Sequence, residues 1–565
     1  MNKQEQEEIE ENTIKKLHWH MGIRDDKEVG RAIHKNRQMD GIYELDENGI
    51  LDGFYEWLEE IGVIKMLKEI TACGVQRMMI PFFQFTLLYF LKVLFGIESI
   101  CSLPRLLFSN QGAMKLVGFN AHQIENGLCS RGKHAGKYKN KTGPICDDTL
   151  ARNIVKVPLK VIEGFFNLTV RLLAKERFFG KRISVIIDPT DIRTTDKWKG
   201  CGKVTRTKRV KDKRGNWKEV EITVYGWKLI VVFYAPLKIP LAAKLVKIQE
   251  SEKNYTMELI KKAEENLSGY CKIKRIKMDR GHLDGKTLWE MNQDGYQFVI
   301  PGRADMQITQ YARRIAKLAI KEKGIPAGCG IKTIDMYQYI QVKEEKIKRG
   351  IGKNQKEEII RTVVVGLQNL GTYDQYGVEG FGKDRYKKNF KPHKINTVVV
   401  VEWEGENYGE NNWVVYLTNM RVNTPMKVFD EYDERSIIEN SLFKEAKQGW
   451  FIKHAPQKTE TALYVHIFFT LAVFALINIY RKHKQEKEEE EEKKQEEDFL
   501  LGIRRWREKT NMINKDKGLV FVGERYGIFW LAEIMVLLGV KVKDIPSRAG
   551  TEEEILSKYG LVPHG

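Results

Sequence analysis

The sequence predicts an α/β protein built on a mixed sheet with helices on both faces. This prediction rests on short apolar runs of strand type, on amphipathic segments of helix type between them, and on the chain length. At 565 residues the chain is too long for one hydrophobic core and must contain several structural regions. Hydrophobic residues make up 42% and charged residues 30% of the chain, which excludes wholesale disorder, collagen-like structure and a disulfide scaffold.

The N-terminal region, residues 1–175, is predicted to be mostly helical. Apolar residues recur at helical spacing over 50–67 and 157–173, as in helices that bury one face. A further helical stretch covers 147–166 and contains the acidic and hydroxyl residues that commonly begin a helix.

Strand-type patterning begins at Lys181 and predicts the first part of a central core over 176–302. Apolar runs bounded by turn residues predict strands, and longer amphipathic runs predict helices. In order, these are strands over 183–187, 221–235 and 240–248, a helix over 254–267, a strand over 273–278, a helix over 284–293 and a strand over 296–300. This order of elements is that of an RNase H-like core with a mixed sheet.

The rest of the chain departs from that rhythm. The region after the core is rich in Gly and Lys and has strand-type runs over 362–367, 396–403 and 413–418, before a long helix at about 427–448. The predicted segments are a β-rich insertion over 303–425, the second part of the core over 426–480, a charged linker or exposed helix over 481–498 and a small separate tail over 499–565.

Two apolar stretches were compared with the length of a membrane span, about 20 residues. The first, 79–97, is interrupted by Gln84 and Lys92, and the second, 463–480, is interrupted by His466 among others. Both are predicted to be buried core helices, and a membrane anchor over 463–480 is the alternative. The polar N-terminus and the seven cysteines without a CxxC pair indicate a cytoplasmic chain with reduced thiols.

The charge balance favours a polyanionic partner. Lys and Arg number 95 against 76 Asp and Glu, which gives a formal net charge of +19. Nucleic acid is the partner that such a surplus most directly suits, although anionic membrane surfaces attract cations as well.

Three acidic residues stand where chemistry is expected. Asp188 follows the first strand, Asp279 follows the fourth, and Glu439 lies in the long helix after the insertion. In open sheets, ligands bind at the carboxyl ends of the strands. The alternative for each residue alone is an ordinary turn Asp or a solvated helical Glu. Three acids fall farther beyond the strand ends and rank lower: Asp191, Asp196 and Asp284.

If the three acids converge at one sheet edge, they predict a two-metal site. Hard cations such as Mg²⁺ or Mn²⁺ prefer oxygen ligands, and carboxylates add the charge needed to hold two of them close. Such a site activates a water or a DNA 3′-hydroxyl and stabilises the leaving oxygen of a phosphodiester.

The helix around Glu439 has an unusual stripe. Tyr432, Arg435, Glu439 and Phe443 are spaced by three, four and four residues, so they share one helical face. Lys447 lies about 60° from the centre of that stripe, still within reach of a phosphate. An Arg435–Glu439 ion pair on a solvated face is the alternative.

These residues resemble the insertion-sequence DDE transposases of the cut-and-paste type, which have an RNase H-like core. The matching segments are IIDPTDI, KMDRGHLDG and YDERSIIENSLFKEAK, the last of which contains the Tyr-Arg-Glu-Lys signature of that family. The β-rich insertion and the apolar helix after the signature are also family features. The sequence departs from the family at the signature's Lys, because that position is Ala446 and Lys447 follows one residue later.

The resemblance implies a role for each matching residue. Asp188, Asp279 and Glu439 would hold two Mg²⁺ ions, for which Mn²⁺ can substitute. Tyr432 and Arg435 would contact DNA beside the cleaved phosphate, and Lys447 would be a weaker phosphate contact. The implied enzyme acts near the nucleoid as a homodimer on double-stranded DNA, cleaving the terminal inverted repeats of an element and joining them to target DNA. The alternatives are an inactive or repurposed DNA-binding relative and a nuclease of the same fold.

Two basic segments are further candidates for DNA contact. Residues 197–214 carry nine Lys or Arg and one Asp, and residues 381–394 carry six and one, with aromatic residues between them. Cations neutralise phosphates, and aromatic rings stack on unpaired bases. The alternative is a solvated hairpin and a solvated loop. The helical stretch 147–166 is a third candidate, as a helix-turn-helix for terminal DNA. The selected basic residues are Lys203, Arg206, Lys208, Arg209, Lys387 and Lys388.

Overall fold

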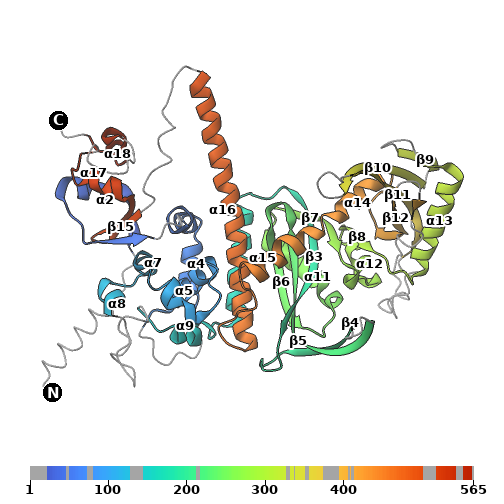
Figure 1. Cartoon of the computed structure of the whole chain (residues 1–565), viewed down its shortest axis with the longest axis horizontal. Helices are drawn as coiled ribbons and strands as arrows, with labels where there is room; N and C mark the ends of the chain where they lie inside the picture. The colour runs from blue at the N-terminus through green and yellow to red at the C-terminus, as the bar shows by residue number, and fades with distance from the viewer. Residues whose placement is uncertain are drawn as a thin grey trace. The chain divides into compact units, whose positions relative to one another are not determined.

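The structure is a computed structural model (Figure 1) that describes most of the chain. The described residues are 22–45, 50–72, 80–126, 144–211, 217–325, 331–335, 338–349, 356–372, 394–404, 407–408, 413–500, 517–541 and 551–562. They form two compact units: residues 170–448, and residues 1–169 together with 449–565.

The first unit, 170–448, is built on a mixed sheet. Its central strands are β3 (Arg182–Thr194), β5 (Trp217–Tyr234), β6 (Ile239–Lys247), β7 (Lys272–Met278) and β8 (Gln297–Pro301). β5 is antiparallel to β3 and β6 is antiparallel to β5, whereas β7 is parallel to β3 and β8 is parallel to β7. The resulting order, β6-β5-β3-β7-β8, is the RNase H-like arrangement that the sequence predicted.

One strand that pairs with these central strands was not predicted. β4 (Gly202–Lys211) pairs with the first half of β5, from Trp217 to Gly226, while β6 pairs with the second half. The distal half of β4 and the facing residues of β5 are exposed, so the two strands form a hairpin arm. β4 lacks the apolar alternation of a half-buried strand, which explains why the sequence pattern did not reveal it.

Helices cover both faces of the core. α11 (Thr256–Leu267) packs on β5, β6 and β7, and α12 (Gly285–Gln293) packs on β8. α14 (Pro425–Asp433) packs on β8 and on the strands beyond it. The predicted long helix over 427–448 is interrupted after α14 by a π-helical turn, η9 (Ile438–Phe443), before α15 (Lys444–Gln448).

The insertion between β8 and α14 extends the same sheet. Its strands are β9 (Ile331–Asp335), β10 (Gln338–Arg349), β11 (Lys356–Thr372), β12 (Lys394–Glu404), β13 (Asn407–Tyr408) and β14 (Val414–Thr418). They pair antiparallel, and β14 joins the insertion to β8. The insertion also contains a helix that the sequence did not predict, α13 (Gln307–Lys323), which packs on β11, β12 and β14.

The second unit contains a helical part. Its helices are α3 (Tyr55–Glu60), α4 (Val63–Glu69), α5 (Phe82–Leu94), α6 (Leu103–Leu106), α7 (Gln111–Val117), α8 (Ala121–Asn126), α9 (Asp147–Ile154) and α16 (Glu460–Leu500). The predicted helix over 150–166 is in fact two helices, α9 and α10 (Leu159–Lys175). Pro158 separates them because the residue before a proline is disfavoured in helical conformation.

The apolar stretch 463–480 is the buried part of α16. By length and composition, Glu460–Gln485 is apolar enough to cross a membrane, yet 83% of its apolar window is buried inside the protein. The predicted burial is therefore confirmed. His466 lies in this stretch and bonds the Tyr89 hydroxyl at 2.9 Å and the Phe451 carbonyl at 3.0 Å. Burial lowers the pKa of His466 to about 3, so its imidazole is neutral. The charged run 481–498 continues α16 as a helix.

The prediction of a separate C-terminal tail is wrong. β15 (Lys517–Val522) and β16 (Arg525–Trp530) form one sheet with β1 (Ile23–Arg24) and β2 (Gly41–Leu45), in the order β1-β16-β15-β2. α2 (Asp26–Asn36), α17 (Leu531–Leu537) and α18 (Glu552–Lys558) complete this small domain around a shared core that includes Val29, Ile33, Val520 and Phe529. Pairing between strands so distant in sequence leaves no local signal.

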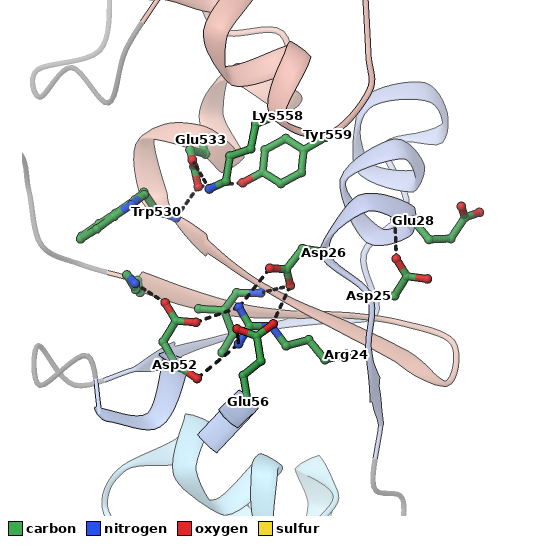
Figure 2. Close-up of polar contacts among 12 residues, drawn as sticks. Arg24, Asp25, Asp26, Glu28, Asp52, Glu56, Trp530, Glu533, Lys558 and Tyr559 are labelled. Carbon is green, nitrogen blue, oxygen red and sulfur yellow. Dashed lines mark hydrogen bonds and ion pairs between the residues drawn. The ribbon is translucent and has the colours of Figure 1, made fainter. Parts of the chain in front are cut away.

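A network of charges links the small domain to Asp52 and to Glu56 of α3 (Figure 2). The Arg24 guanidinium contacts Asp52 at 2.7 Å, Asp26 at 3.0 Å and Glu56 at 3.4 Å. Lys517 contacts Asp52 as a second cation. Burial raises the pKa of Asp52, but the hydrogen bonds and charges of Lys517 and Arg24 outweigh it, and the pKa is lowered on balance.

A buried carboxylate holds the helices of the same domain together (Figure 2). Glu533 is only 4% exposed and accepts hydrogen bonds from the Tyr559 hydroxyl at 2.9 Å and the Lys558 ammonium at 2.8 Å. The backbone N–H of Trp530 also donates to it at 3.0 Å. Each oxygen of this carboxylate therefore has a donor, as a buried charge requires.

Candidate active site

The sheet brings two of the predicted acids to adjacent positions. β3 and β7 are parallel neighbours, and Ile187 pairs with Met278 in their register. Asp188 and Asp279, which follow these two residues, therefore emerge side by side. Asp188 is 1% exposed, whereas the side chain of Asp279 is 42% exposed.

The third acid joins them through an arginine. One guanidinium nitrogen of Arg435 lies 2.7 Å from Asp188 Oδ1, 3.1 Å from Glu439 Oε1 and 4.0 Å from Asp279 Oδ2. The three carboxylates that the sequence singled out thus converge on a single cation. The Arg435–Glu439 pair expected along the helix is present, but it belongs to this larger cluster.

The cluster holds Asp188 in an unfavourable electrostatic environment. The pKa of Asp188 is raised to about 7, chiefly by burial; the hydrogen bond and charge of Arg435 lower it, and the charges of Asp279 and Glu439 raise it. The pKa of Arg435 is also raised, because its bonds to carboxylates outweigh its own burial. One guanidinium is therefore too little positive charge for three acids, and such perturbed carboxyls are typical of functional sites.

Polar contacts on the same face of the sheet fix the helix that supplies Arg435. Glu431 of α14 accepts a hydrogen bond from Ser184 Oγ at 3.1 Å and pairs with Arg275, and Lys277 lies 3.4 Å from Glu431. Lys277 also pairs with Glu434. Since Lys277 is only 2% exposed, these ion pairs hold the end of α14 against β7.

The helix then changes geometry before Glu439. Arg435 N–H bonds the Tyr432 carbonyl at 2.8 Å and Ile438 N–H bonds the Arg435 carbonyl at 3.2 Å, which is a tight turn with three-residue spacing. The π-helical turn η9 follows and carries Glu439. Single π-turns recur at functional sites, and this one directs Glu439 toward the Arg435 guanidinium.

The other residues of the predicted stripe lie beside the cluster. The Tyr432 ring packs on Tyr416 with centroids 4.6 Å apart, and burial raises its pKa. Phe443 is buried. Lys447 donates to Thr190 Oγ1 at 2.6 Å, two residues past Asp188, so the shifted signature lysine still reaches the part of β3 that carries Asp188.

The loop after Asp279 is shaped by two residues whose roles sequence reasoning missed. A Cβ atom on Gly281 would lie 2.0 Å from Glu252 Oε1, so a larger residue there would displace the Glu252 carboxylate. His282 is fully buried and bonds Thr256 Oγ1 at 2.8 Å. Burial lowers its pKa to about 4, so the ring is neutral. The motif Asp-Arg-Gly-His was a visible signal, and the structure gives its Gly and His a role in holding the Asp279 loop.

Two of the lower-ranked acids have structural partners. Asp191 pairs with Arg206 at 2.6 Å and with Arg193 at 3.6 Å. Asp284 caps α12 by accepting from the Thr287 N–H at 3.0 Å.

The selected basic residues have different surroundings. Lys203, Arg206, Lys208 and Arg209 all lie on β4 of the hairpin arm. Arg206 is neutralised by Asp191, and Arg209 pairs with Glu219 at 3.0 Å. Lys387 and Lys388 lie outside the described residues. The possible helix-turn-helix corresponds to α9 and α10.

The donor chemistry of the cluster fits a divalent metal. Three carboxylates gathered on one positive charge supply the oxygen ligands and the charge that Mg²⁺ or Mn²⁺ requires. In the arrangement described here, the Arg435 guanidinium occupies that position. Across the described ranges, no three Asp, Glu, His or Cys side chains are grouped so as to surround an ion.

Fold and acids together define a protein of the RNase H-like class with a carboxylate triad. The family model for the transposase DDE domain matches residues 180–476, more than half of the 565 residues. The chain belongs to this family of DNA transposases, which are DNA-cleaving enzymes that generally use divalent metal ions.

Two further comparisons add little. Among solved structures, the chain is similar to a piggyBac transposase in a synaptic complex with hairpin DNA, at 9% identity and a TM-score of 0.35, over 79% of each chain. That similarity is too low to transfer residues or roles. No curated protein matches the chain.

Proposed function

We propose that the protein cleaves the ends of an insertion sequence and joins them to target DNA by metal-assisted phosphoryl transfer. The observation that supports this most directly is the convergence of Asp188, Asp279 and Glu439 on one cationic group. Two bound Mg²⁺ ions would activate the attacking hydroxyl and stabilise the leaving oxygen. Asp188, Asp279 and Glu439 are the proposed ligands, and Mn²⁺ is the expected substitute.

Arg435 has a second task in this proposal. Its guanidinium neutralises the acids while no DNA is bound, and it then turns to the phosphate beside the scissile bond. A guanidinium suits this exchange because it binds carboxylate and phosphate with the same forked geometry. Tyr432 and Lys447, which contacts Thr190 of β3, are the proposed neighbouring DNA contacts.

The basic arm formed by β4 and β5 supplies contacts farther from the chemistry. Lys203, Arg206, Lys208 and Arg209 are proposed to bind phosphates of double-stranded DNA, in the terminal inverted repeats or in the target. Lys387 and Lys388 are proposed to do the same, and the region 1–175 to bind terminal DNA. We also propose a homodimer in the DNA complex and a cytoplasmic, nucleoid-associated location.

The test uses the purified protein with the DNA that flanks its own gene. In Mg²⁺, cleaved and joined products are expected from the wild type and should fall at least about 1,000-fold in Glu439→Ala. The matched control is Glu445→Ala on α15, where a half-exposed Glu faces Lys238 at 3.8 Å. That control should retain full activity and DNA binding.

The other outcomes identify the alternatives. Salt-sensitive DNA binding without cleavage in Mg²⁺ or Mn²⁺ would indicate an inactive or repurposed DNA-binding relative. Cleavage without joining would indicate a nuclease of the same fold. Full activity of Glu439→Ala would remove that residue from the site. Lys447→Ala should be milder than the acid variants, because it loses one phosphate contact and no ligand.

A further inference from the structure

The helix α13 in the insertion has two sharply different sides. Its inner side is buried on β11, β12 and β14 and consists of Ile308, Thr309, Ala312, Ala316 and Ala319. The three alanines let the helix lie close to the sheet, and they leave the longer side chains of the helix on the outside. The sequence of the outer side is therefore free of packing requirements.

The outer side is a continuous polar stripe. Gln307, Gln310, Arg314, Lys317 and Lys321 follow one another at spacings of three, four, three and four, so they lie along one line of the helix. All five are exposed. Tyr311 and Leu318 border the stripe and are each 51% exposed.

The positive charge of this stripe has little compensation. Within the described residues, Arg314, Lys317 and Lys321 form no ion pair, and Lys317 lies over the Trp413 ring at 5.5 Å. Glu322 is the single acid of the helix, and it projects about 100° away from the centre of the stripe. The outer side of α13 is therefore cationic along its C-terminal half and carries amides along its N-terminal half.

This arrangement fits duplex DNA better than a protein. The centre of a protein interface is apolar and poor in lysine, whereas here the centre is polar and the two apolar side chains lie at the border. A helix of 17 residues is about 25 Å long and fits the major groove. Gln and Arg side chains read adenine and guanine edges, and Lys side chains bind phosphates.

We propose that α13 lies in the major groove of double-stranded DNA, with Gln310 and Arg314 on base edges and Lys317 and Lys321 on phosphates. The proposal rests on the proposed function, since it assumes that the substrate is DNA. It assigns the insertion a reading role, apart from the cleavage that the acid cluster performs.

The test measures DNA binding by the full-length protein as a function of salt. The variant Arg314→Ala/Lys317→Ala/Lys321→Ala is compared with the wild type on the duplex flanking the gene. Loss of one base contact and two phosphate contacts should weaken binding roughly 10- to 100-fold at 150 mM salt and reduce the slope of log affinity against log salt by about 2, one for each lysine. An unchanged thermal midpoint establishes that the variant is folded.

The matched control removes three cations that already face acids. Lys244, Lys261 and Lys262 lie near Glu258, Asp294 and Glu265 at 2.5 Å, 3.6 Å and 3.2 Å. Their triple alanine variant should keep the wild-type slope. Equal losses of DNA affinity in the two triple variants would mean that net charge alone causes the effect, and would overturn the proposal.

A single substitution tests the reading role. Gln310→Ala should keep the salt slope but lose roughly tenfold in preference for the flanking duplex over a scrambled duplex of equal composition. Unchanged preference together with unchanged binding by the triple variant would overturn the proposal. A change in oligomeric state of the triple variant, with DNA binding intact, would also overturn it and make α13 a contact between copies of the chain.

The failure of this inference is distinguishable from failure of the proposed function. If the wild type cleaves and joins DNA, and the triple variant does so equally at every salt concentration, only the assignment of α13 fails. If the wild type neither binds nor cleaves DNA, the proposed function fails, and the assignment of α13 fails with it.

Discussion

Two arginines in this protein each face three carboxylates, and the two clusters differ in what surrounds the acids. Arg24 in the small domain contacts Asp26, Asp52 and Glu56 within 3.4 Å. Arg435 in the core contacts Asp188, Asp279 and Glu439 within 4.0 Å. The residue types are almost the same, but in the first cluster a second cation, Lys517, contacts Asp52.

The consequence is seen in the pKa of the least exposed acid of each cluster. Asp52, with two cations, has a lowered pKa, whereas Asp188, with one cation shared among three acids, has a pKa raised to about 7. Two cations contact the acids of the Arg24 cluster, whereas one guanidinium is shared by the three acids of the Arg435 cluster. Burial and the number of cations per acid, more than the kind of residue, set the pKa of the least exposed acid in each cluster.

The largest expected difference comes from removing each arginine. At pH 7, Arg24→Met should lower the free energy of unfolding by about 3 kcal/mol, because it removes the main hydrogen-bond and charge partner of three partly exposed acids. Arg435→Met should cost only about 1 kcal/mol, since Asp188 can take up a proton and the other two acids are partly exposed. Urea denaturation measures both. The control is Arg31→Met, which removes an exposed ion pair with Glu28. Equal losses of unfolding free energy in Arg24→Met and Arg435→Met would contradict the proposed difference between the two clusters.

The second expected effect is a dependence on pH. Asp188 has a pKa of about 7 in the folded protein and 3.8 as its ordinary value. Between these values the unfolded chain has lost the proton that the folded chain keeps, so raising the pH favours unfolding. Asp188→Asn removes this effect. The variant should gain stability relative to the wild type between pH 4 and 7, on the order of 2–4 kcal/mol, and remain level above.

Urea denaturation of both proteins at pH 5 and pH 8 checks this difference. A difference in stability that stays constant across the range would contradict the raised pKa of Asp188. The expected loss of DNA cleavage in the same variant is a separate readout and does not depend on the pH result.

The smallest expected effect concerns the second cation. Lys517→Met should destabilise the small domain by about 1 kcal/mol at neutral pH, because Asp52 then shares one cation with two other acids. Because the pKa of Asp52 is lowered in the folded protein, its ionised carboxylate stabilises the fold at pH values above the ordinary pKa of an Asp. This stabilisation is lost as the pH falls, so the difference in stability between Lys517→Met and the wild type should shrink toward about pH 3. Lys541→Met, at an exposed position of the same domain, is the control. An equal loss of stability in Lys517→Met and Lys541→Met would show that the contact of Lys517 with Asp52 does not stabilise the domain.

Sequence reasoning predicted the core because its strands are local apolar runs. The strand order from β3 to β8 and the positions of Asp188 and Asp279 follow from where those runs end. Glu439 was found through the signature around it. The Arg435 bridge was seen only as an intrahelical pair, because its contact with Asp188 joins residues 247 positions apart.

Three features could not be predicted for identifiable reasons. α13 buries alanines, which give little apolar periodicity. β4 is exposed along most of its length and has no apolar alternation. The small domain pairs residues 23–45 with residues 517–530, and neither segment contains a sign of the other. Such pairings depend on tertiary structure alone.

The joining of distant segments in one domain has a consequence for synthesis. β1 and β2 lack their partner strands until residues 517–530 have left the ribosome. At roughly 5–20 residues per second, the interval is on the order of half a minute to a minute and a half. Throughout that time the unpaired strand edges and the apolar face of α2 are open to chaperones and proteases. A chain whose translation stopped before residue 517 would contain the whole core, but its small domain would stay incomplete and accessible to proteases.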